Sequence, residues 1–392
     1  MKAGYKQTEV GVIPQEWGVV ALGSLATTVA SGRSSPGATS GTYPVHGSTG
    51  VIGYSEWPEY EGDAILAARV GANAGRLNLV SGNYGVTDNT ILLRLRSSCC
   101  LPFFWRQLEA KNLNSMVFGS GQPLITGSQL KALSVSVPSP TEQRAIAKAL
   151  SDVDGLLGGL GLIAKKRDLK QAAMQQLLTG QTRLPGFHGE WEVKRLGDHV
   201  AFLRNGVNSR AELQPEGRVK YLHYGDVHAC NDVFISPTAL PALPEDKAMS
   251  LDRLRDGDLI FADASEDIAG VCKSVEVRGA GDADVVSGLH TIAARFDKQV
   301  LADGFKGFLQ FCPPFARHLR RLAAGTKVYA TNRAHVASVE MRLPTVAEQA
   351  AIAAVLSDMD TEIAGLEQRR TKTHALKQAM MQELLTGKTR LV

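Results

Sequence analysis

The chain contains one segment twice. The first copy begins at Glu142-Gln143 and the second at Glu348-Gln349, and both continue through Leu-Ser-Asp-x-Asp to Leu-Lys-Gln-Ala-x-Met-Gln-x-Leu-Leu-Thr-Gly-x-Thr-Arg-Leu. The final stretch, residues 169–184 and 376–391, matches at 13 of 16 positions. An internal repeat constrains the architecture of the whole chain, because two like elements in one polypeptide build a pseudo-symmetric molecule.

Both copies predict a long helix. Pro138 and Pro344 lie just upstream, Thr141 with the following Glu-Gln is typical of an N-terminal cap, and Gly180 and Gly387 are expected C-terminal caps. Each helix should span about 38 residues, or roughly 57 Å at 1.5 Å per residue. The apolar positions step by four and three, as along a coiled-coil seam. The seam residues are Ile146, Leu150, Val153, Leu157 and Leu160, and Ile352, Leu356, Met359, Ile363 and Leu366.

Each predicted helix is expected to pack against the other, because a lone seam of this length would be poorly soluble. A helical hairpin inside one core is less consistent with the sequence, since roughly 165 residues lie between the copies and such connections are usually short. The first copy carries Gly155, Gly158, Gly159 and Gly161, and each helix-interior glycine costs about 1 kcal/mol relative to alanine. We therefore expect a bend or a close helix approach there.

The helices divide the chain into four segments: residues 1–138, 139–184, 185–344 and 345–392. The first and third are domain-sized and open alike, with Glu16-Trp17 and Glu190-Trp191, but we interpret their middles as not corresponding. Short β-rich runs interrupted by Gly and Asn indicate a mixed α/β (α+β) fold: two globular domains and two long helices with pseudo-twofold symmetry. The runs are 64–70, 89–95, 259–262 and 289–296.

Composition and charge limit the function. Hydrophobic residues make up 44% of the chain, and no apolar run approaches the ~20 residues that span a membrane. With no N-terminal signal, we expect a cytoplasmic protein. The five cysteines are odd in number and form no C-x-x-C pair, so neither a disulfide framework nor a zinc site is predicted. Residues 304–339 contain no acidic side chain, and Arg317, Arg320 and Arg321 share one helical face, which predicts phosphate binding or a solvated structural helix.

Motifs that could carry catalysis are incomplete. Thr386-Gly387-Lys388-Thr389 resembles the end of a phosphate-binding loop, but Gln382 occupies the position of its first glycine and a helix precedes it. Cys312-Pro313-Pro314-Phe315 resembles a methyltransferase tetrapeptide, yet cysteine stands where a hydrogen-bond acceptor is needed. His223 and His228 are more typical of a strand and turn than of a metal site. We expect a chain that is not an enzyme and holds no metal or cofactor.

The order of these parts resembles the specificity subunit of type I restriction–modification enzymes. The resemblance includes the repeated helix ending Leu-Leu-Thr-Gly-x-Thr-Arg-Leu, the opening at residues 5–17, and residues 265–267, 288–291 and 325–328. It implies two target-recognition domains, each of which reads half of a split sequence in double-stranded DNA, held apart by two antiparallel helices. It also implies that the helices dock two methyltransferase subunits, which carry S-adenosylmethionine, and that restriction subunits join through these.

Two other functions stay open. The chain could be the specificity part of a fused methyltransferase–nuclease system, or a coiled-coil scaffold that does not bind DNA. Separate neighbouring genes for a methyltransferase and a restriction subunit would favour the specificity subunit. The sequence does not give the target bases, because base choice depends on a few side chains on loops.

Candidate DNA contacts are polar side chains on Gly-rich loops, although a structural role in the loop is the alternative for each. Arginine and lysine could equally hold phosphates, which gives affinity without specificity. The candidates are His46, Ser48, Arg69, Asn73 and Gln122 in the first domain, and Tyr224, Ser265, His290, Lys327, Tyr329 and Asn332, with the three arginines 317, 320 and 321, in the second.

The C-terminal halves of the predicted helices carry more apolar surface than one seam needs. We expect this surplus to dock the methyltransferase subunits. The residues are Leu169, Met174, Leu177 and Leu178 in the first copy, and Leu376, Met381, Leu384 and Leu385 in the second.

Overall fold

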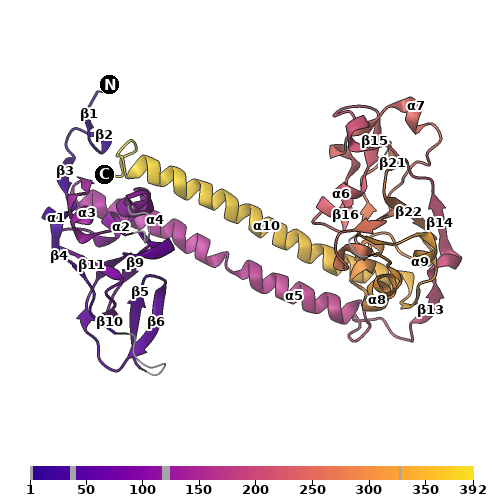
Figure 1. The fold of residues 1–392 in the computed structure, drawn as a ribbon, viewed down its shortest axis with the longest axis horizontal. Helices are drawn as coiled ribbons and strands as arrows, with labels where there is room; N and C mark the ends of the chain where they lie inside the picture. Colours follow the sequence, from indigo (N-terminus) through magenta and orange to yellow (C-terminus); the bar gives the residue numbers. More distant parts are fainter. Residues whose placement is uncertain (1–2, 36–40, 117–123, 282, 326–327) are drawn as a thin grey trace. The chain divides into compact units, whose positions relative to one another are not determined.

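The structure, a computed structural model, describes residues 3–35, 41–116, 124–281, 283–325 and 328–392 (Figure 1). The chain forms two compact units. Unit 1 comprises Met1–Gly161 and Glu367–Val392, and unit 2 comprises Leu162–Leu366. Each unit therefore contains part of both repeat copies, which the division into four consecutive segments did not anticipate. In the part of the chain that is described, no helix is long and apolar enough to cross a membrane.

The two copies of the repeat differ in helical continuity. The second copy is α10 (Val346–Leu384), an uninterrupted helix of 39 residues (Figure 1). The first copy is split into α4 (Pro140–Gly159) and α5 (Leu162–Leu177). At the interruption, the amides of Leu160 and Gly161 donate to carbonyls three residues back, as in a 3-10 turn. A single long helix is thus confirmed for the second copy and wrong for the first, where the glycine cluster ends the α-helix.

The helix caps follow the repeat. Ser139 Oγ accepts the Glu142 amide at 3.2 Å, so Ser139 rather than Thr141 caps α4, and Thr345 Oγ1 accepts the Glu348 amide at 3.3 Å. At the other end, Gly180 and Gly387 have φ of 72° and 68°. Their left-handed backbone confirms both as C-terminal caps.

Unit 1 contains two four-stranded sheets. One has the strand order β4-β11-β8-β9, and the other has the order β6-β5-β10-β7, in which β5 and β10 are parallel. The strands are β1 (Tyr5–Thr8), β2 (Gly11–Pro14), β3 (Gly18–Ala21), β4 (Ala26–Ser31), β5 (Tyr43–Gly47), β6 (Gly50–Ser55), β7 (Tyr60–Glu61), β8 (Ala64–Ala68), β9 (Leu77–Val80), β10 (Asn83–Val86), β11 (Thr90–Leu95) and β12 (Ser134–Val137). Its other helices are α1 (Leu22–Leu25), α2 (Leu101–Ala110) and α3 (Gly127–Ala132).

Unit 2 contains a five-stranded sheet of order β14-β22-β18-β20-β16 and a three-stranded sheet of order β17-β15-β21. The strands are β13 (Glu192–Arg195), β14 (Val200–Leu203), β15 (Val219–Leu222), β16 (Phe234–Ile235), β17 (Ala242–Leu243), β18 (Leu259–Ala262), β19 (Ala264–Ser265), β20 (Ser274–Val277), β21 (Asp284–Ser287), β22 (Thr291–Phe296), β23 (Tyr329–Ala330) and β24 (Glu340–Leu343). Its other helices are α6 (Tyr224–Ala229), α7 (Glu245–Ala248), α8 (Pro313–Leu322) and α9 (Arg333–Ala337).

The two units share one strand framework. The order β4-β11-β8-β9 of unit 1 recurs as β14-β22-β18-β20 in unit 2, and the parallel pair β5/β10 recurs as β15/β21. The antiparallel pair β3/β12 recurs as β13/β24. The interpretation that the middles do not correspond is therefore wrong for the fold, although their sequences differ. Strand order needs only apolar residues of suitable size in the core, so it can persist without matching side chains.

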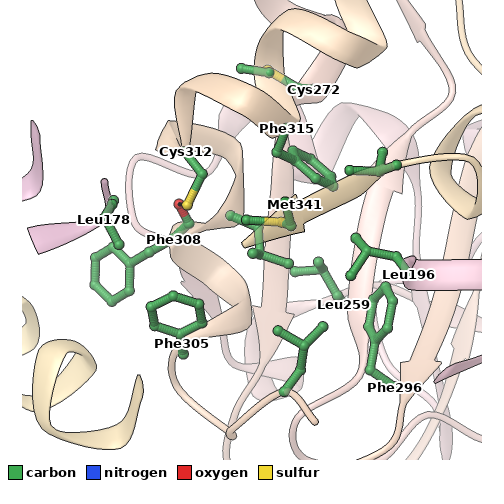
Figure 2. Close-up of a cluster of buried hydrophobic side chains, with 14 of the residues drawn as sticks. Leu178, Leu196, Leu259, Cys272, Phe296, Phe305, Phe308, Cys312, Phe315 and Met341 are labelled. Carbon is green, nitrogen blue, oxygen red and sulfur yellow. Dashed lines mark hydrogen bonds between the residues drawn. The ribbon is translucent and has the colours of Figure 1, made fainter. Parts of the chain in front are cut away.

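The start of each repeat helix packs into the core of its own unit. Ile146 and Leu150 of α4 belong to the core around Trp17 and the α2 phenylalanines. Ile352 and Leu356 of α10 belong to the core of unit 2, whose phenylalanines are drawn in Figure 2. These four residues therefore stabilise their own units instead of forming a seam between helices. Helix pairing stays a prediction for the seam residues farther along, Val153, Leu157, Leu160, Ile363 and Leu366; Met359 packs against the unit 2 core.

The repeated polar residues bind one another across the two copies. Arg390, from the end of copy two, forms a two-point ion pair with Glu142 at the start of copy one, with Nη2 2.8 Å from Oε2. Arg183, from the end of copy one, pairs in the same way with Glu348, with Nη2 2.6 Å from Oε2. Both carboxylates are only 1% exposed. Each unit thus contains the start of one copy and the end of the other, joined by a buried carboxylate.

The glutamines beside these carboxylates fix the start of each helix. Gln143 Nε2 donates to the Pro138 carbonyl at 2.9 Å, and its Oε1 accepts the Cys100 amide at 3.0 Å. Gln349 makes the equivalent pair of bonds, to the Pro344 carbonyl and from the amide of residue 302, both at 2.9 Å. Because these side chains are buried, each bond satisfies a backbone group that water cannot reach.

The ion pairs shift the titration of their members. Hydrogen bonding to Glu142 and then to Glu16 raises the pKa of Arg390, and the Arg390 guanidinium lowers the pKa of Glu16. Hydrogen bonding to Glu348 raises the pKa of Arg183. Both guanidiniums therefore stay charged throughout the pH range in which proteins fold.

Replacing Arg390 by alanine should destabilise unit 1, because the buried Glu142 carboxylate would lose its cation. We expect the free energy of unfolding in urea to fall by about 2–3 kcal/mol, less than for a fully buried pair because Arg390 is partly exposed. Adding Glu142→Gln should recover part of this loss. The Lys148–Asp152 pair is exposed on both sides, so Lys148→Ala is the control and should have little effect. Equal losses for both alanine variants would contradict the interpretation.

Candidate nucleic-acid interface

In unit 2, several strands end at one edge. Asp263 follows β18, the turn 288–290 joins β21 to β22, and Tyr224 follows β15. The Asp263 amide donates to the His290 carbonyl at 3.1 Å, and the Tyr224 amide donates to the Leu289 carbonyl at 3.2 Å. The Thr331 amide donates to the Asp263 carbonyl at 2.8 Å. Residues distant in sequence are thus held side by side by backbone bonds at the ends of the strands.

The side chains at this edge form an aromatic and polar cluster. The Tyr224 ring lies 5.5 Å from the His290 ring and 6.1 Å from the His228 ring, measured between centroids. His290 Nδ1 lies 3.1 Å from Asp263 Oδ1. Ser265 is paired with Tyr329 between β19 and β23. We call the set Tyr224, Asp263, Ser265, His290 and Tyr329 the unit 2 edge.

The two histidines considered for metal binding contact the backbone. His223 is the N-cap of α6, and its Nδ1 accepts the Gly225 amide at 3.2 Å. Burial lowers the pKa of His223, which favours the neutral ring that can accept this hydrogen bond. His228 Nε2 lies 2.9 Å from the Ala264 carbonyl oxygen. Among the residues whose placement is described, no three His, Cys, Asp or Glu side chains gather as a metal site.

Unit 1 has an equivalent edge. The Arg69 amide, after β8, donates to the Asn89 carbonyl at 2.9 Å, as Asp263 does to His290. The Thr87 amide donates to the His46 carbonyl at 3.0 Å, and the Ile125 amide donates to the Arg69 carbonyl at 2.9 Å. Between these strand ends lies a cavity of about 350 Å³. We call the polar residues here the unit 1 edge: Arg33, Ser48, Arg69, Asp88 and Asn89.

Part of the unit 1 edge has unused hydrogen-bonding capacity. The Thr87 hydroxyl, at the wall of the cavity, is buried and has no hydrogen-bond partner among the described residues. Arg69 Nη1 donates to Ser31 Oγ at 3.2 Å, and among the described residues this uses one of the five N–H groups of the side chain. The edge can therefore present donors and acceptors to a polar ligand.

Two of the five predicted residues of the first domain, Ser48 and Arg69, belong to the unit 1 edge, and a third, His46, lies beside it. Ser48 lines the cavity, and Arg69 directly follows β8. His46 is half-buried, with its ring 6.1 Å from that of Tyr84. Burial lowers the pKa of His46. Asn73 lies instead at another cavity, beside Trp105. Gln122 lies outside the described residues.

Those predicted residues of the second domain that the structure describes divide into three groups. Tyr224, Ser265, His290 and Tyr329 form the unit 2 edge, whereas Asn332 caps α9 by accepting the His335 amide at 2.9 Å. Arg317, Arg320 and Arg321 are exposed on α8, and Arg320 Nη2 donates to the Ala269 carbonyl at 3.2 Å. Lys327 lies outside the described residues.

Sequence reasoning missed Arg33, Asp88 and Asn89 in unit 1 and Asp263 in unit 2. Asp88 directly precedes the predicted β-rich run 89–95, Asn89 is the first residue of that run, and Asp263 directly follows the run 259–262. Polar residues at the ends of predicted strands were thus the available signal. To use this signal, one must know which strands end at the same edge, and only the fold gives that information.

The rejected catalytic motifs have structural roles. Cys312 lies in the unit 2 core (Figure 2), and burial raises the pKa of its thiol to about 12. The two prolines after it begin α8. Gly387 caps α10 and packs against Pro14.

Comparisons with known proteins agree with this architecture. Residues 14–160 match the type I restriction modification DNA specificity domain. The chain is 25% identical to the type I restriction enzyme MjaVIII specificity subunit of Methanocaldococcus jannaschii, over 83% of this chain and 79% of that protein. It is 24% identical to the putative MjaX specificity subunit of the same organism, over 99% of this chain and 97% of that protein. Over most of its length the chain is thus similar to specificity subunits of type I restriction enzymes, and its first part matches their DNA specificity domain.

A solved structure supports the fold of the chain. The S subunit of the type I restriction–modification system from M. genitalium aligns with a TM-score of 0.66 at 15% identity, covering 98% of this chain and 99% of that one. The mixed helix and strand class, the two domains and the repeated helical element are confirmed.

The residues predicted to dock a partner differ in exposure. Leu177 and Leu178 are buried in the unit 2 core, and Leu384 and Leu385 are buried in the unit 1 core. Met174 and Met381 are partly buried against the same cores. The two equivalent leucines earlier in the repeat, Leu169 and Leu376, are 52% and 51% exposed. Burial of the four Leu-Leu residues corrects the expectation that they form surplus surface.

The turn of the unit 2 edge should tolerate asparagine but not a β-branched residue. His290 has a φ of 55°, a left-handed conformation that costs most residues roughly 1–2 kcal/mol. We therefore expect His290→Val to lower the free energy of unfolding by about that amount, and His290→Asn to have little effect. Urea unfolding measures this. His188 is exposed and has an ordinary φ, so His188→Val is the control. An equal loss of stability in that variant would contradict backbone strain at His290 as the cause.

Proposed function

We propose that this chain is a type I specificity subunit that recognises a bipartite sequence in double-stranded DNA, with each unit reading one half. The observation that carries the proposal is the pair of edges. They are built on the same strand ends and the same backbone bonds, but their side chains differ. Position by position, Arg69 corresponds to Asp263 and Asn89 corresponds to His290. Two like frameworks with unlike side chains suit two different half-sites.

The side chains at the edges suit base recognition. Arg33 and Arg69 offer the paired N–H groups that recognise guanine, and Asn89 can donate and accept at adenine. At the unit 2 edge, Asp263 can accept from the amino group of cytosine, while the Tyr224 and His290 rings offer apolar faces to bases or a thymine methyl. The unit 1 edge is therefore richer in donors than the unit 2 edge.

Affinity would come from charges beside the edges. Arg317 and Arg321 are exposed on α8, in a stretch of unit 2 without acidic residues. Arg320 contacts the Ala269 carbonyl, close to strand β19, which carries Ser265. These guanidiniums suit phosphates, whose contacts position a protein on DNA without reading its sequence.

We also propose that the repeat helices hold two methyltransferase subunits. Leu169 and Leu376 are equivalent in the repeat and equally exposed, so they give two like surfaces for two like partners. S-adenosylmethionine would be bound by those partners, and restriction subunits would join through them. The curated relatives are specificity subunits matched over most of their own length, which favours a separate, non-catalytic subunit over part of a fused enzyme.

Changing one edge should alter one half of the recognised sequence. In cells expressing this chain with its methyltransferase, we expect Asn89→Ala or Arg33→Ala to relax the half-site read by unit 1, with a discrimination loss of about 1–3 kcal/mol. Sequencing of methylated bases across the genome measures both halves at once. Asp263→Asn should alter the other half alone.

The matched controls are Arg96→Ala and Arg218→Ala, which change exposed arginines outside the two edges. They should leave both half-sites intact. The proposal fails if Asn89→Ala and Asp263→Asn alter the same half, or if neither changes the methylated sequence while each chain remains folded.

Helix length should set the unread gap between the half-sites. Four residues inserted within 155–161, matched by four after Ala364 in α10, would add about 6 Å of helix, against 3.4 Å per base pair. The insertion turns each helix by about 400°, close to one full turn, so side-chain phase is nearly kept. We expect a gap wider by about one or two base pairs and unchanged half-sites, measured by methylated-base sequencing.

Alanine substitution is the control for helix stiffness without added length. A Cβ at Gly155, Gly158 or Gly159 would meet no atom within 4 Å. The triple alanine variant should therefore fold and recognise the same sequence with the same gap. An insertion that changes the bases but leaves the gap would show that the helices do not set the spacing.

A further inference from the structure

A cavity of about 590 Å³ lies beside Trp191 in unit 2. Gly180, Val193 and Glu340 contribute to its wall. Trp191 is only partly buried, and its indole Nε1 has no hydrogen-bond partner among the described residues. The corresponding tryptophan of unit 1, Trp17, is 1% exposed, and its indole donates to Glu142 at 3.0 Å. The two tryptophans occupy equivalent positions at the openings of the two units, but Trp17 is fully covered by other residues and Trp191 is not.

In unit 1 the hairpin β1–β2 provides that cover. Ile13 is buried in the core with Trp17, and Pro14 lies against Gly387, where an added Cβ would come within 2.5 Å of it. The Tyr5 hydroxyl donates to the Gly387 carbonyl at 2.9 Å. The hairpin thus covers the end of the second repeat copy.

The hairpin also contacts strand β12. Ser134 Oγ donates to Glu9 Oε1 at 2.6 Å. Ser134 pairs with Ala21 in β3, and Glu340 pairs with Arg195 in β13, so Ser134 and Glu340 are equivalent. The hairpin of unit 1 therefore contacts the equivalents of two residues that line the unit 2 cavity, Gly180 and Glu340.

Unit 2 has a short connection where unit 1 has the hairpin. Between the end of α5 at Leu177 and the start of β13 at Glu192, the described chain forms no strand. Arg183 Nη1 donates to the Gly189 carbonyl at 2.7 Å, which holds this connection against the end of the first repeat copy. The surface that a hairpin covers in unit 1 is consequently open in unit 2.

We propose that the cavity beside Trp191 docks a hairpin of a second polypeptide, supplied by the methyltransferase partner; this rests on the proposed function. The chemistry of the occupant follows from unit 1. Branched or proline side chains would pack on Trp191 and Gly180, as Ile13 and Pro14 do at their equivalents. Because Glu340 replaces Ser134, the side chain in the position of Glu9 must be a cation.

The same charge argues against a second copy of this chain as the occupant. Its own hairpin would bring Glu9 against Glu340, and two like charges at such a contact are unfavourable. Arg342 also lines the cavity, but it does not stand at the position that Glu9 contacts in unit 1. It replaces Ser136, which in unit 1 is hydrogen-bonded to Gln107 and Leu385 and not to Glu9.

Synthetic peptides test the site directly on the full chain. The probes are a peptide of residues 3–16 and the same peptide with Glu9→Lys, each labelled for fluorescence anisotropy. We expect the Glu9→Lys peptide to bind saturably and about tenfold more tightly than the unchanged peptide. In a chain carrying Glu340→Lys, this preference should reverse. Glu245→Lys changes another acidic residue of unit 2 and should leave the preference as it was.

A substitution that fills the cavity provides a second test of the proposal. Val193 is 63% exposed, so Val193→Trp should fold while it blocks both peptides. Val207→Trp, at another exposed valine of unit 2 outside the cavity wall, should not block them. Val193→Trp and Glu340→Lys should also reduce co-purification of the methyltransferase subunit severalfold, whereas Val207→Trp should not.

Three outcomes would overturn the proposal. The first is that neither peptide binds saturably to any of these chains. The second is peptide binding with unchanged methyltransferase co-purification, which would remove that partner as the source. The third is self-association of the chain that Val193→Trp abolishes, which would assign the cavity to a second copy. If methylated-base sequencing showed no bipartite pattern, the proposed function would be refuted. The peptide-binding result would not depend on that outcome.

Discussion

The buried carboxylates of Glu142 and Glu348 determine how the rest of the molecule is organised. A carboxylate with 1% exposure is very unfavourable without a cation, and each finds one in the last arginine of the other repeat copy. This requirement brings the end of copy two to unit 1 and the end of copy one to unit 2. The leucine pairs beside those arginines then complete the two cores. The repeat is therefore a reciprocal connection between two units, and its apolar residues serve those units first.

Once the cores are complete, the strand ends in both units are fixed in the same way. Backbone bonds equivalent to those between Asp263 and His290 hold Arg69 beside Asn89. Because the backbone makes these contacts, the framework does not depend on matching side chains at the two edges. The side chains can therefore differ between the units while the strand ends stay in place, as the proposed recognition of two different half-sites requires.

Sequence predicted the parts governed by local rules. Helical periodicity, the cap glycines and the helix-weakening glycine cluster were visible because each depends on nearby residues. Burial was harder: a glutamate is seldom buried, so nothing local distinguishes Glu142 from a surface residue. Leu384 was misassigned to a partner surface because helical periodicity shows an apolar face but not what covers it. Asp263 was missed because its neighbours at the edge come from four separate segments of the chain.

The reciprocal connection has a consequence for the order of synthesis. The core of unit 1 includes Leu384 and Leu385, and its buried Glu142 is neutralised by Arg390. A ribosome makes these residues more than two hundred positions after Glu142 itself. A nascent chain can therefore complete unit 2 first. Until its last residues are made, unit 1 has an incomplete core, and the Glu142 carboxylate has no cation to pair with. A chain released before residue 384 would lack a finished first unit, and proteases would recognise it as unfolded.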